Sequence, residues 1–139
     1  MNNRFNSLIK AFSIKPSKLF LVDCLGALLT GFLVGTVLIK HVDVFGMPVK
    51  PLTILSIIAY TYAIYSICCY FFLDKNWRPY LKFIAFANLL YCCLTITFII
   101  YFFSSVTTLG LIYFSAELIV IVCLVIIELM TAAHRSAKK

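Results

Sequence analysis

Two glutamates inside the last long apolar stretch of the chain are the residues best suited to chemistry. Glu117 and Glu128 both lie within residues 109–131, which are otherwise mostly apolar. They are eleven positions apart, so on a helix of 3.6 residues per turn their side chains point in directions about 20° apart. A carboxyl group in such surroundings can relay a proton, bind a cation or hold a polar ligand. The spacing therefore predicts one helical face with carboxyls at two depths.

Other polar side chains lie inside the earlier apolar stretches. Asp23 is in the first stretch, Ser66 in the second and Asn88 in the third. By helical rise, Asp23 lies at about the depth of Glu128, and Asn88 lies in the same half of its helix. The alternative is a buried hydrogen-bonded network that fixes helix packing, with Asp23 and Glu128 reaching toward the membrane surface. The sequence predicts a candidate polar, ion or ligand site formed by Glu117, Asp23, Asn88, Glu128 and Ser66.

Four apolar stretches must position these side chains. They cover residues 19–39, 51–73, 83–103 and 109–131, and each exceeds the roughly 18 residues that mark a transmembrane helix. The chain of 139 residues is 63% hydrophobic and 12% charged, whereas soluble domains are about 25% charged. The sequence therefore predicts an all-α protein, a four-helix transmembrane bundle over 19–131. A basic amphipathic segment, 1–18, precedes it, and a basic tail, 132–139, follows.

The basic residues are distributed very unevenly. Ten of the twelve precede the first stretch, lie between the second and third, or follow the fourth. Only Lys40 and Lys50 belong to the opposite side. The positive-inside rule then places both termini in the cytoplasm. The net charge of +7 is read as this topology signal, with affinity for anionic lipid headgroups. The expected partners are the lipid bilayer and a second copy or a larger membrane complex, and not nucleic acid.

Two further patterns concern helix packing. Phe5, Leu8, Ile9 and Phe12 have the spacing of an amphipathic helix, which would lie on the inner leaflet; a disordered basic tail is the alternative. In the first stretch, small residues recur every four positions, which lets another helix approach closely. This packing could be within the chain or between copies. The small-residue stripe consists of Ala27, Gly31 and Gly35.

The connections and the remaining polar residues give more local predictions. Gly46 favours a turn after the first stretch, and Thr107 or Thr108 can cap the fourth helix. Tyrosine hydroxyls of the second stretch, such as that of Tyr62, need polar partners on neighbouring helices. The six cysteines all fall inside apolar stretches. They are interpreted as small buried hydrophobic residues, and not as disulfides.

Several chemistries are disfavoured by the residues themselves. The apolar stretches contain no histidine for haem ligation, and the chain has no C-x-x-C redox pair. It also has no H-E-x-x-H, P-loop or serine nucleophile elbow. We therefore expect no enzymatic activity, no cofactor and no bound metal.

Four segments carry a resemblance to known sequences: residues 23–30, 45–48, 87–93 and 113–117. In these segments the chain resembles a group of uncharacterised small bacterial four-helix integral membrane proteins. The resemblance implies a bacterial inner-membrane protein and carries no assigned activity. Two functions remain open: an interaction or accessory subunit that packs through its helices, or a small solute or proton-coupled transporter that uses a membrane-embedded carboxylate.

Overall fold

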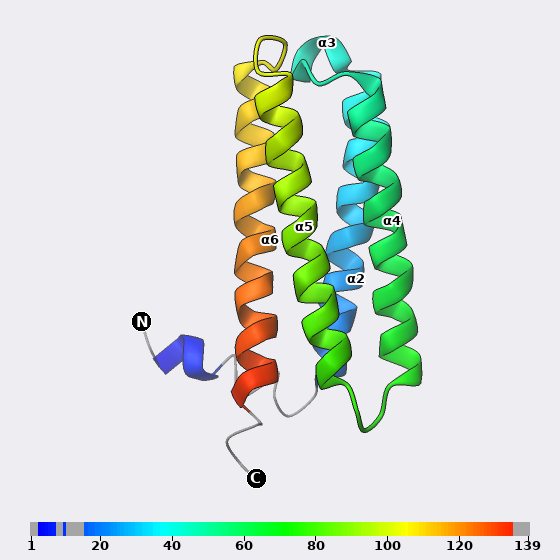
Figure 1. Cartoon of the computed structure of the whole chain (residues 1–139), viewed down its shortest axis with the longest axis vertical. Helices are drawn as coiled ribbons and strands as arrows, with labels where there is room; N and C mark the ends of the chain where they lie inside the picture. Colours follow the sequence, from blue (N-terminus) through cyan, green and yellow to red (C-terminus); the bar gives the residue numbers. More distant parts are fainter. Residues whose placement is uncertain (1–2, 8–9, 11–15, 135–139) are drawn as a thin grey trace.

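Helices make up nearly all of the described structure. The computed structural model describes residues 3–7, 10 and 16–134, and no strand occurs among them. The four long helices are long and apolar enough to cross a membrane, which confirms the predicted all-α four-helix bundle and makes this a small multi-pass membrane protein. In chain order, the elements are α2 (Ser17–Phe32), the π-helix η1 (Leu33–Leu38), α3 (Val42–Phe45), α4 (Val49–Phe72), α5 (Arg78–Tyr101) and α6 (Thr108–His134) (Figure 1).

Parts of both terminal segments lie outside the described residues. Phe5 belongs to a helical stretch, residues 3–7, and is 38% exposed. Leu8, Ile9 and Phe12, which complete the predicted amphipathic pattern, lie outside the described residues, as do positions 135–139 of the predicted basic tail. The amphipathic segment therefore stays a prediction.

The helix boundaries follow the apolar stretches closely, except at α5. This helix begins at Arg78, five residues before the predicted boundary at 83. Pro79 occupies its first turn, where the missing backbone N–H costs nothing and the fixed φ favours the helix. The apolar stretch begins only at 83 because the first turn of α5 is polar, and Pro79 is typical of a helix start.

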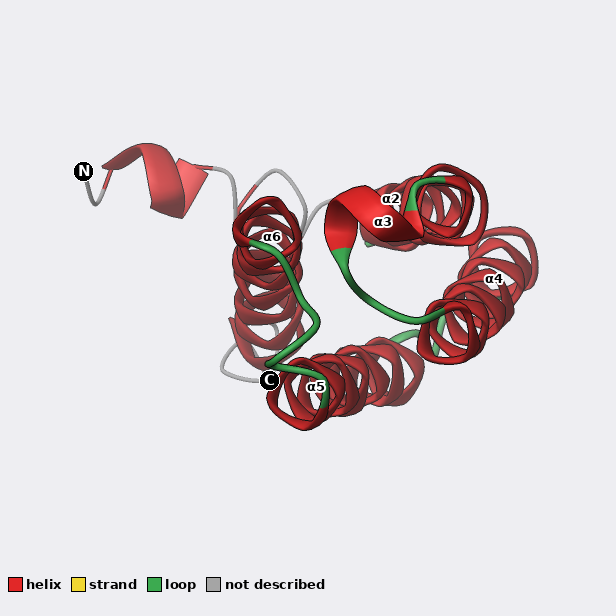
Figure 2. Ribbon diagram, turned by 90° about the horizontal axis from the view of Figure 1, so that it is seen from above, coloured by secondary structure: helices red, strands yellow, loops and turns green. Residues whose placement is uncertain are grey.

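The bundle consists of two antiparallel hairpins. The helix formed by α2 and η1 packs along α4, and α5 packs along α6, while α4 and α5 share a smaller contact. α2 and α6 barely touch. Viewed along the axis, the helices follow one another around a ring in the order α2, α4, α5, α6, so α2 and α6 lie next to each other across a loosely packed seam (Figure 2).

We call the end of the bundle with α3 the α3 end. We call the other end, where α2 begins and α6 finishes, the terminal end (Figure 1).

Backbone contacts join the two hairpins at the α3 end. The N–H of Thr107 donates to the carbonyl of Phe45 at 3.1 Å, and the Thr107 hydroxyl donates to the carbonyl of Val44 at 2.6 Å. Gly46 ends α3 with φ +78°, a left-handed conformation that favours glycine. The same Thr107 hydroxyl accepts the N–H of Gly110 at 3.1 Å, which confirms it as the predicted cap of α6. We call this contact between residues 44–46 and Thr107 the loop clamp.

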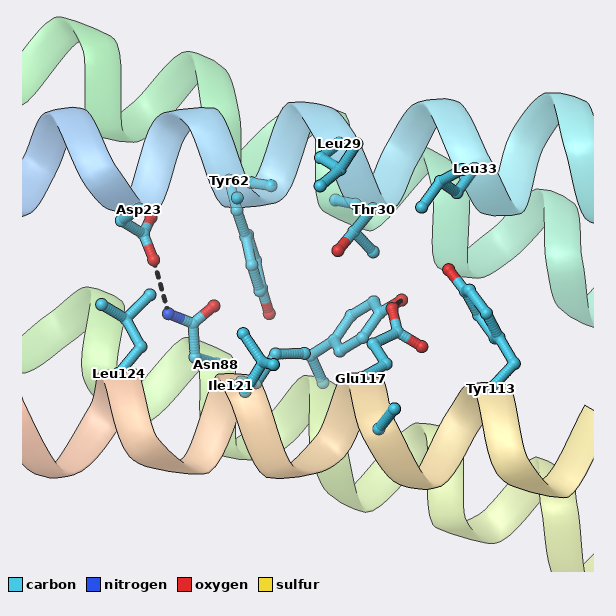
Figure 3. A pocket seen from close by; sticks show the side chains of 16 residues that line it. Asp23, Leu29, Thr30, Leu33, Tyr62, Asn88, Tyr113, Glu117, Ile121 and Leu124 are labelled. Carbon is cyan, nitrogen blue, oxygen red and sulfur yellow. Dashed lines mark hydrogen bonds between the residues drawn. The ribbon is translucent and has the colours of Figure 1, made fainter.

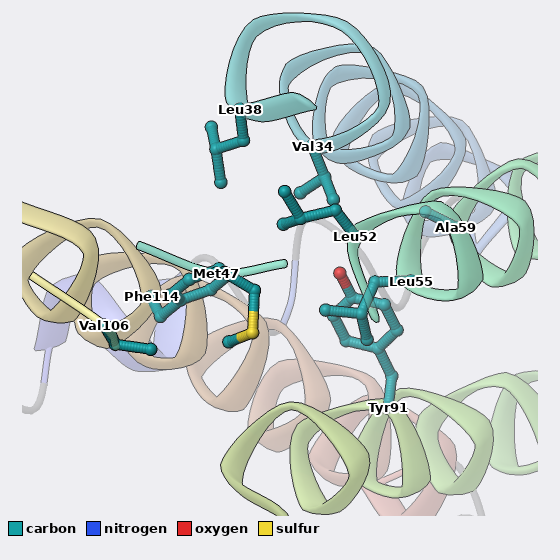
Figure 4. Close-up of a cluster of buried hydrophobic side chains, with 9 residues drawn as sticks. All are labelled: Val34, Leu38, Met47, Leu52, Leu55, Ala59, Tyr91, Val106 and Phe114. Atoms are coloured by element: carbon teal, nitrogen blue, oxygen red, sulfur yellow. The ribbon is translucent and has the colours of Figure 1, made fainter. Parts of the chain in front are cut away.

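Two hydrophobic clusters fill the bundle, one toward each end. Near the terminal end, Leu19 and Phe20 pack with Trp77 and Leu81. Toward the α3 end, Met47 is fully buried between the hairpins. The polar side chains considered below lie between these clusters. The cluster near the α3 end consists of Val34, Leu38, Met47, Leu52, Leu55, Ala59, Tyr91, Val106 and Phe114 (Figure 4).

The glycines of the small-residue stripe are used within the chain. A Cβ added at Gly31 would lie 3.0 Å from the ring of Tyr60, and one added at Gly35 would overlap the hydroxyl of Ser56. That hydroxyl donates to the carbonyl of Gly31 at 2.9 Å, two residues before η1 begins. The close approach of α4 to α2 therefore depends on both glycines, and neither is free to face a second copy.

The cysteine prediction holds for half of the set. Cys24, Cys69 and Cys92 are buried, and none of the six forms a disulfide. Consecutive helical residues point about 100° apart, so the neighbours of Cys69 and Cys92 turn outward. The prediction of burial is wrong for the exposed thiols, which are Cys68, Cys93 and Cys123.

Candidate functional site

The five predicted polar side chains form two groups at different levels of the bundle. Toward the terminal end, each of the four long helices contributes one buried residue to what we call the polar cluster. Glu117 stands apart from this cluster, closer to the α3 end on α6 (Figure 3). The polar cluster consists of Asp23 on α2, Ser66 on α4, Asn88 on α5 and Glu128 on α6.

Asp23 is the centre of the polar cluster. Its Oδ2 accepts the hydroxyl of Ser66, and its Oδ1 accepts the side-chain N–H of Asn88 at 2.8 Å (Figure 3). Asp23 is only 2% exposed and Ser66 is fully buried. This part of the site matches the network reading of the sequence, because the carboxyl group of Asp23 is held by donors from two other helices.

Glu128 is buried without such donors. Its side chain is 0% exposed, and neither carboxyl oxygen has a hydrogen-bond partner among the described residues. Asp23 and Asn88 are close enough to influence its charge, although neither is within hydrogen-bond geometry of its oxygens. The expectation that Asp23 and Glu128 reach out to the membrane surface is therefore wrong. Both are buried inside the bundle.

Glu117 has one partner and one free oxygen. The hydroxyl of Tyr91 donates to its Oε1 at 3.0 Å, while its Oε2 is buried with no partner among the described residues. Tyr91 was not among the predicted site residues. Its position on the Asn88 face of α5 was the signal that could have included it, because residues three apart share one side of a helix.

A cavity of about 260 Å³ lies in front of Glu117. It runs along the seam between α2 and α6, from the level of Asp23 and Asn88 to that of Tyr113 (Figure 3). Its wall is mainly apolar and includes Ala27 of the small-residue stripe. Helical rise gives the depths of the polar residues but does not predict this space, which exists because α2 and α6 barely touch.

Tyrosine rings line part of this cavity. Tyr62, Tyr91 and Tyr113 come from three different helices. The Tyr62 hydroxyl donates to the carbonyl of Ala87 at 2.9 Å, as expected for the tyrosines of the second apolar stretch. The rings of Tyr62 and Tyr91 meet edge to face at 6.5 Å. The cavity thus combines an unpaired carboxyl oxygen with the electron-rich faces of aromatic rings.

Comparison with known proteins leaves function to be argued from this geometry. No protein-family model, curated protein or solved structure matches the chain at a significant level. Within the described part of the chain, no three or more His, Cys, Asp and Glu side chains are grouped to hold a metal ion. Glu117 can accept a hydrogen bond or pair with a positive charge, and the cavity in front of it can enclose an apolar group.

Proposed function

We propose that this protein binds a small, mainly apolar amine inside the bilayer, as the substrate-binding step of a small transporter. One observation carries the proposal: Oε2 of Glu117 is buried without a partner at the wall of the cavity. A buried polar atom that lacks a partner is costly, and the cost is larger for a charged group. An ammonium group in the cavity would supply both the charge and the hydrogen bond.

The size and lining of the cavity support this class of ligand. An apolar cavity of about 150 Å³ holds benzene, so 260 Å³ suits a slightly larger molecule. Ammonium groups are attracted to the faces of aromatic rings, and Tyr62, Tyr91 and Tyr113 all line the space. The apolar remainder of the wall favours a hydrocarbon body over a sugar or a phosphate.

The seam between α2 and α6 supports access from the side of the bundle. Leu29 on α2 and Val120 on α6 line the cavity, and they are 60% and 67% exposed. A molecule dissolved in the bilayer can therefore reach the cavity without crossing a packed helix interface. Amines with an apolar body partition into membranes, which fits this route.

The binding proposal predicts a strong effect of Glu117→Gln. We expect 2-phenylethylamine to raise the thermal unfolding temperature of the purified protein in detergent, because a ligand that binds only the folded state stabilises it. Glu117→Gln should weaken the affinity by about tenfold or more, as expected for the loss of a charged partner. The neutral analogue 2-phenylethanol is the matched ligand control and should distinguish little between the two proteins. Equal amine affinities of the wild type and the variant would overturn the proposal.

We also propose a bacterial inner-membrane location with both termini in the cytoplasm. α2 begins and α6 finishes at the same end of the bundle (Figure 1), and ten of the twelve basic residues belong to that side. Reporter-enzyme fusions after residue 46 and at the C-terminus would check the orientation. Activity of a cytoplasm-only reporter after residue 46 would contradict it.

Assembly through α6, as an accessory subunit or with a second copy, is the second candidate function. In the most apolar window of α6, only 17% of the window is buried in the bundle, against 39% for the corresponding windows of α4 and of α5. Exposed Cys123 on α6 provides a probe, with exposed Cys68 on α4 and Cys93 on α5 as matched controls. If copies meet along α6, a variant that retains only Cys123 should form an oxidised dimer in membranes. Dimers only from the Cys68 or the Cys93 variant would exclude α6 as the interface.

A further inference from the structure

The polar cluster has unpaired buried oxygens that the proposed amine site does not use. Both oxygens of Glu128 lack partners, and so does the hydroxyl of Thr131, within the described chain. Both residues are 0% exposed. They are three residues apart on α6 and therefore share one face of that helix. Neither lines the 260 Å³ cavity, so these oxygens need an explanation of their own.

Two carboxyl groups face this position without a basic neighbour. Asp23 and Glu128 are close enough for their charges to interact. None of the basic side chains that the structure describes is among the groups that interact with Asp23 or Glu128. Two buried carboxylates without a positive partner repel each other and have both lost their hydration. A bound cation would offset both costs.

A proton alone would not satisfy this group. Protonation of Glu128 would remove its charge but would add an O–H donor. In the observed geometry, the second Glu128 oxygen and the Thr131 hydroxyl would still lack partners. A cation coordinated by oxygens can contact several of these atoms at once, because hard cations take six or more oxygen ligands. The unpaired atoms therefore fit a cation better than a proton.

The surroundings favour a monovalent ion. The unpaired oxygens belong to Glu128 and Thr131, and Asp23 and Asn88 of the polar cluster carry further carboxylate and amide oxygens. Such a set suits hard cations and excludes soft transition metals. Mg²⁺ gives up its water reluctantly and keeps several water molecules, while Glu128 and Thr131 are fully buried and do not line the cavity. An ion here would be largely dehydrated, which costs least for a single charge.

We propose that the polar cluster, together with Thr131, binds a monovalent alkali cation such as Na⁺. The ion would lie between α2 and α6, next to the hydrogen-bonded Asp23 carboxylate, and would link the two hairpins near the terminal end of the bundle. Asp23 and Asn88 also line the cavity of the amine site, but Glu128 and Thr131 do not. The inference depends on the unpaired oxygens of Glu128 and Thr131, and it stands whether or not an amine binds at Glu117.

The test is the unfolding temperature of the purified full chain in detergent at constant ionic strength. In the Glu117→Gln variant, where the proposed amine site is removed and choline can serve as the inert reference cation, Na⁺ should raise it relative to choline, because the ion binds the folded state only. In the same background, Glu128→Gln should abolish the shift or move the half-effective Na⁺ concentration by about tenfold or more. Thr131→Val, which keeps the shape and removes only the hydroxyl, should weaken the Na⁺ effect in a protein that still folds.

Thr97→Val on α5 is the matched control, since Thr97 is exposed and its hydroxyl donates to Cys93 within its own helix. In the same background, its Na⁺ response should equal that of the Glu117→Gln protein. No Na⁺ response in the Glu117→Gln protein would overturn the proposal, as would a full response in both Glu128→Gln and Thr131→Val. Stabilisation by Mg²⁺ or Ca²⁺ with none by Na⁺ would also overturn the monovalent assignment. Loss of amine binding in the Glu117→Gln variant with an unchanged Na⁺ response would separate the two sites.

Discussion

Gly46→Val should lower the unfolding temperature of this protein more than any other single glycine substitution. Gly46 has φ +78°, and a left-handed backbone costs a residue with a side chain about 1–2 kcal/mol, with β-branched residues worst placed. An added Cβ would also overlap the backbone of Ser105 and Thr107, which cannot move without breaking the loop clamp. Thermal unfolding followed by circular dichroism in detergent measures the effect.

Gly26→Ala is the matched control. Gly26 lies in the middle of α2, and a Cβ added there would meet nothing within 4 Å. Alanine is the better helix former by about 0.8–1 kcal/mol, so this variant should be slightly more stable than the wild type. If Gly46→Val and Gly26→Ala had the same unfolding temperature, the loop clamp would not contribute to stability as described.

Ala27→Phe should abolish amine binding without unfolding the protein. Ala27 lines the cavity opposite α6. A benzyl group is about the size of the benzene that fills a cavity of about 150 Å³, so it would occupy more than half of the 260 Å³. We expect a loss of affinity for 2-phenylethylamine of about a hundredfold. The unfolding temperature without ligand should stay the same or rise, because filling a cavity commonly stabilises a protein.

Leu28→Phe provides the control for this substitution. Leu28 is the next residue of α2 but is 43% exposed on the outer surface and does not line the cavity. This variant should bind the amine as the wild type does. Equal affinities of Ala27→Phe and the wild type would show that the amine binds elsewhere, even if Glu117→Gln also weakens binding.

The parts of the fold that depend on hydropathy were predictable from the sequence. The four transmembrane helices follow from apolar stretches too long for anything else, and Thr107 acts as the predicted cap. The pairing of α2 with α4 was not predictable, because the small-residue stripe allows any close partner. Only the fit of Ser56 and Tyr60 against its glycines identifies α4.

The candidate site was predictable in its members and not in its arrangement. The shared face of Glu117 and Glu128 follows from helical periodicity, which cannot say what lies opposite. In the structure, Glu117 meets Tyr91 and Glu128 lies near Asp23. Thr131 was missed because a threonine hydroxyl in a helix usually bonds its own backbone. Whether the Thr131 hydroxyl has a hydrogen-bond partner depends on where its neighbours lie in three dimensions, which the sequence does not show.

The loop clamp also has a mechanical consequence. The two hairpins are joined by hydrogen bonds at the α3 end. Toward the terminal end they are joined by residues 73–77 between α4 and α5 and by the hydrogen bond from Asn88 to Asp23, which a widening of the seam would break. Because α2 and α6 barely touch, a rocking motion of one hairpin against the other would pivot at the α3 end. Displacement would grow with distance from that pivot, so it would be larger at Glu128 than at Glu117. The seam between α2 and α6 would therefore open and close most at the polar cluster.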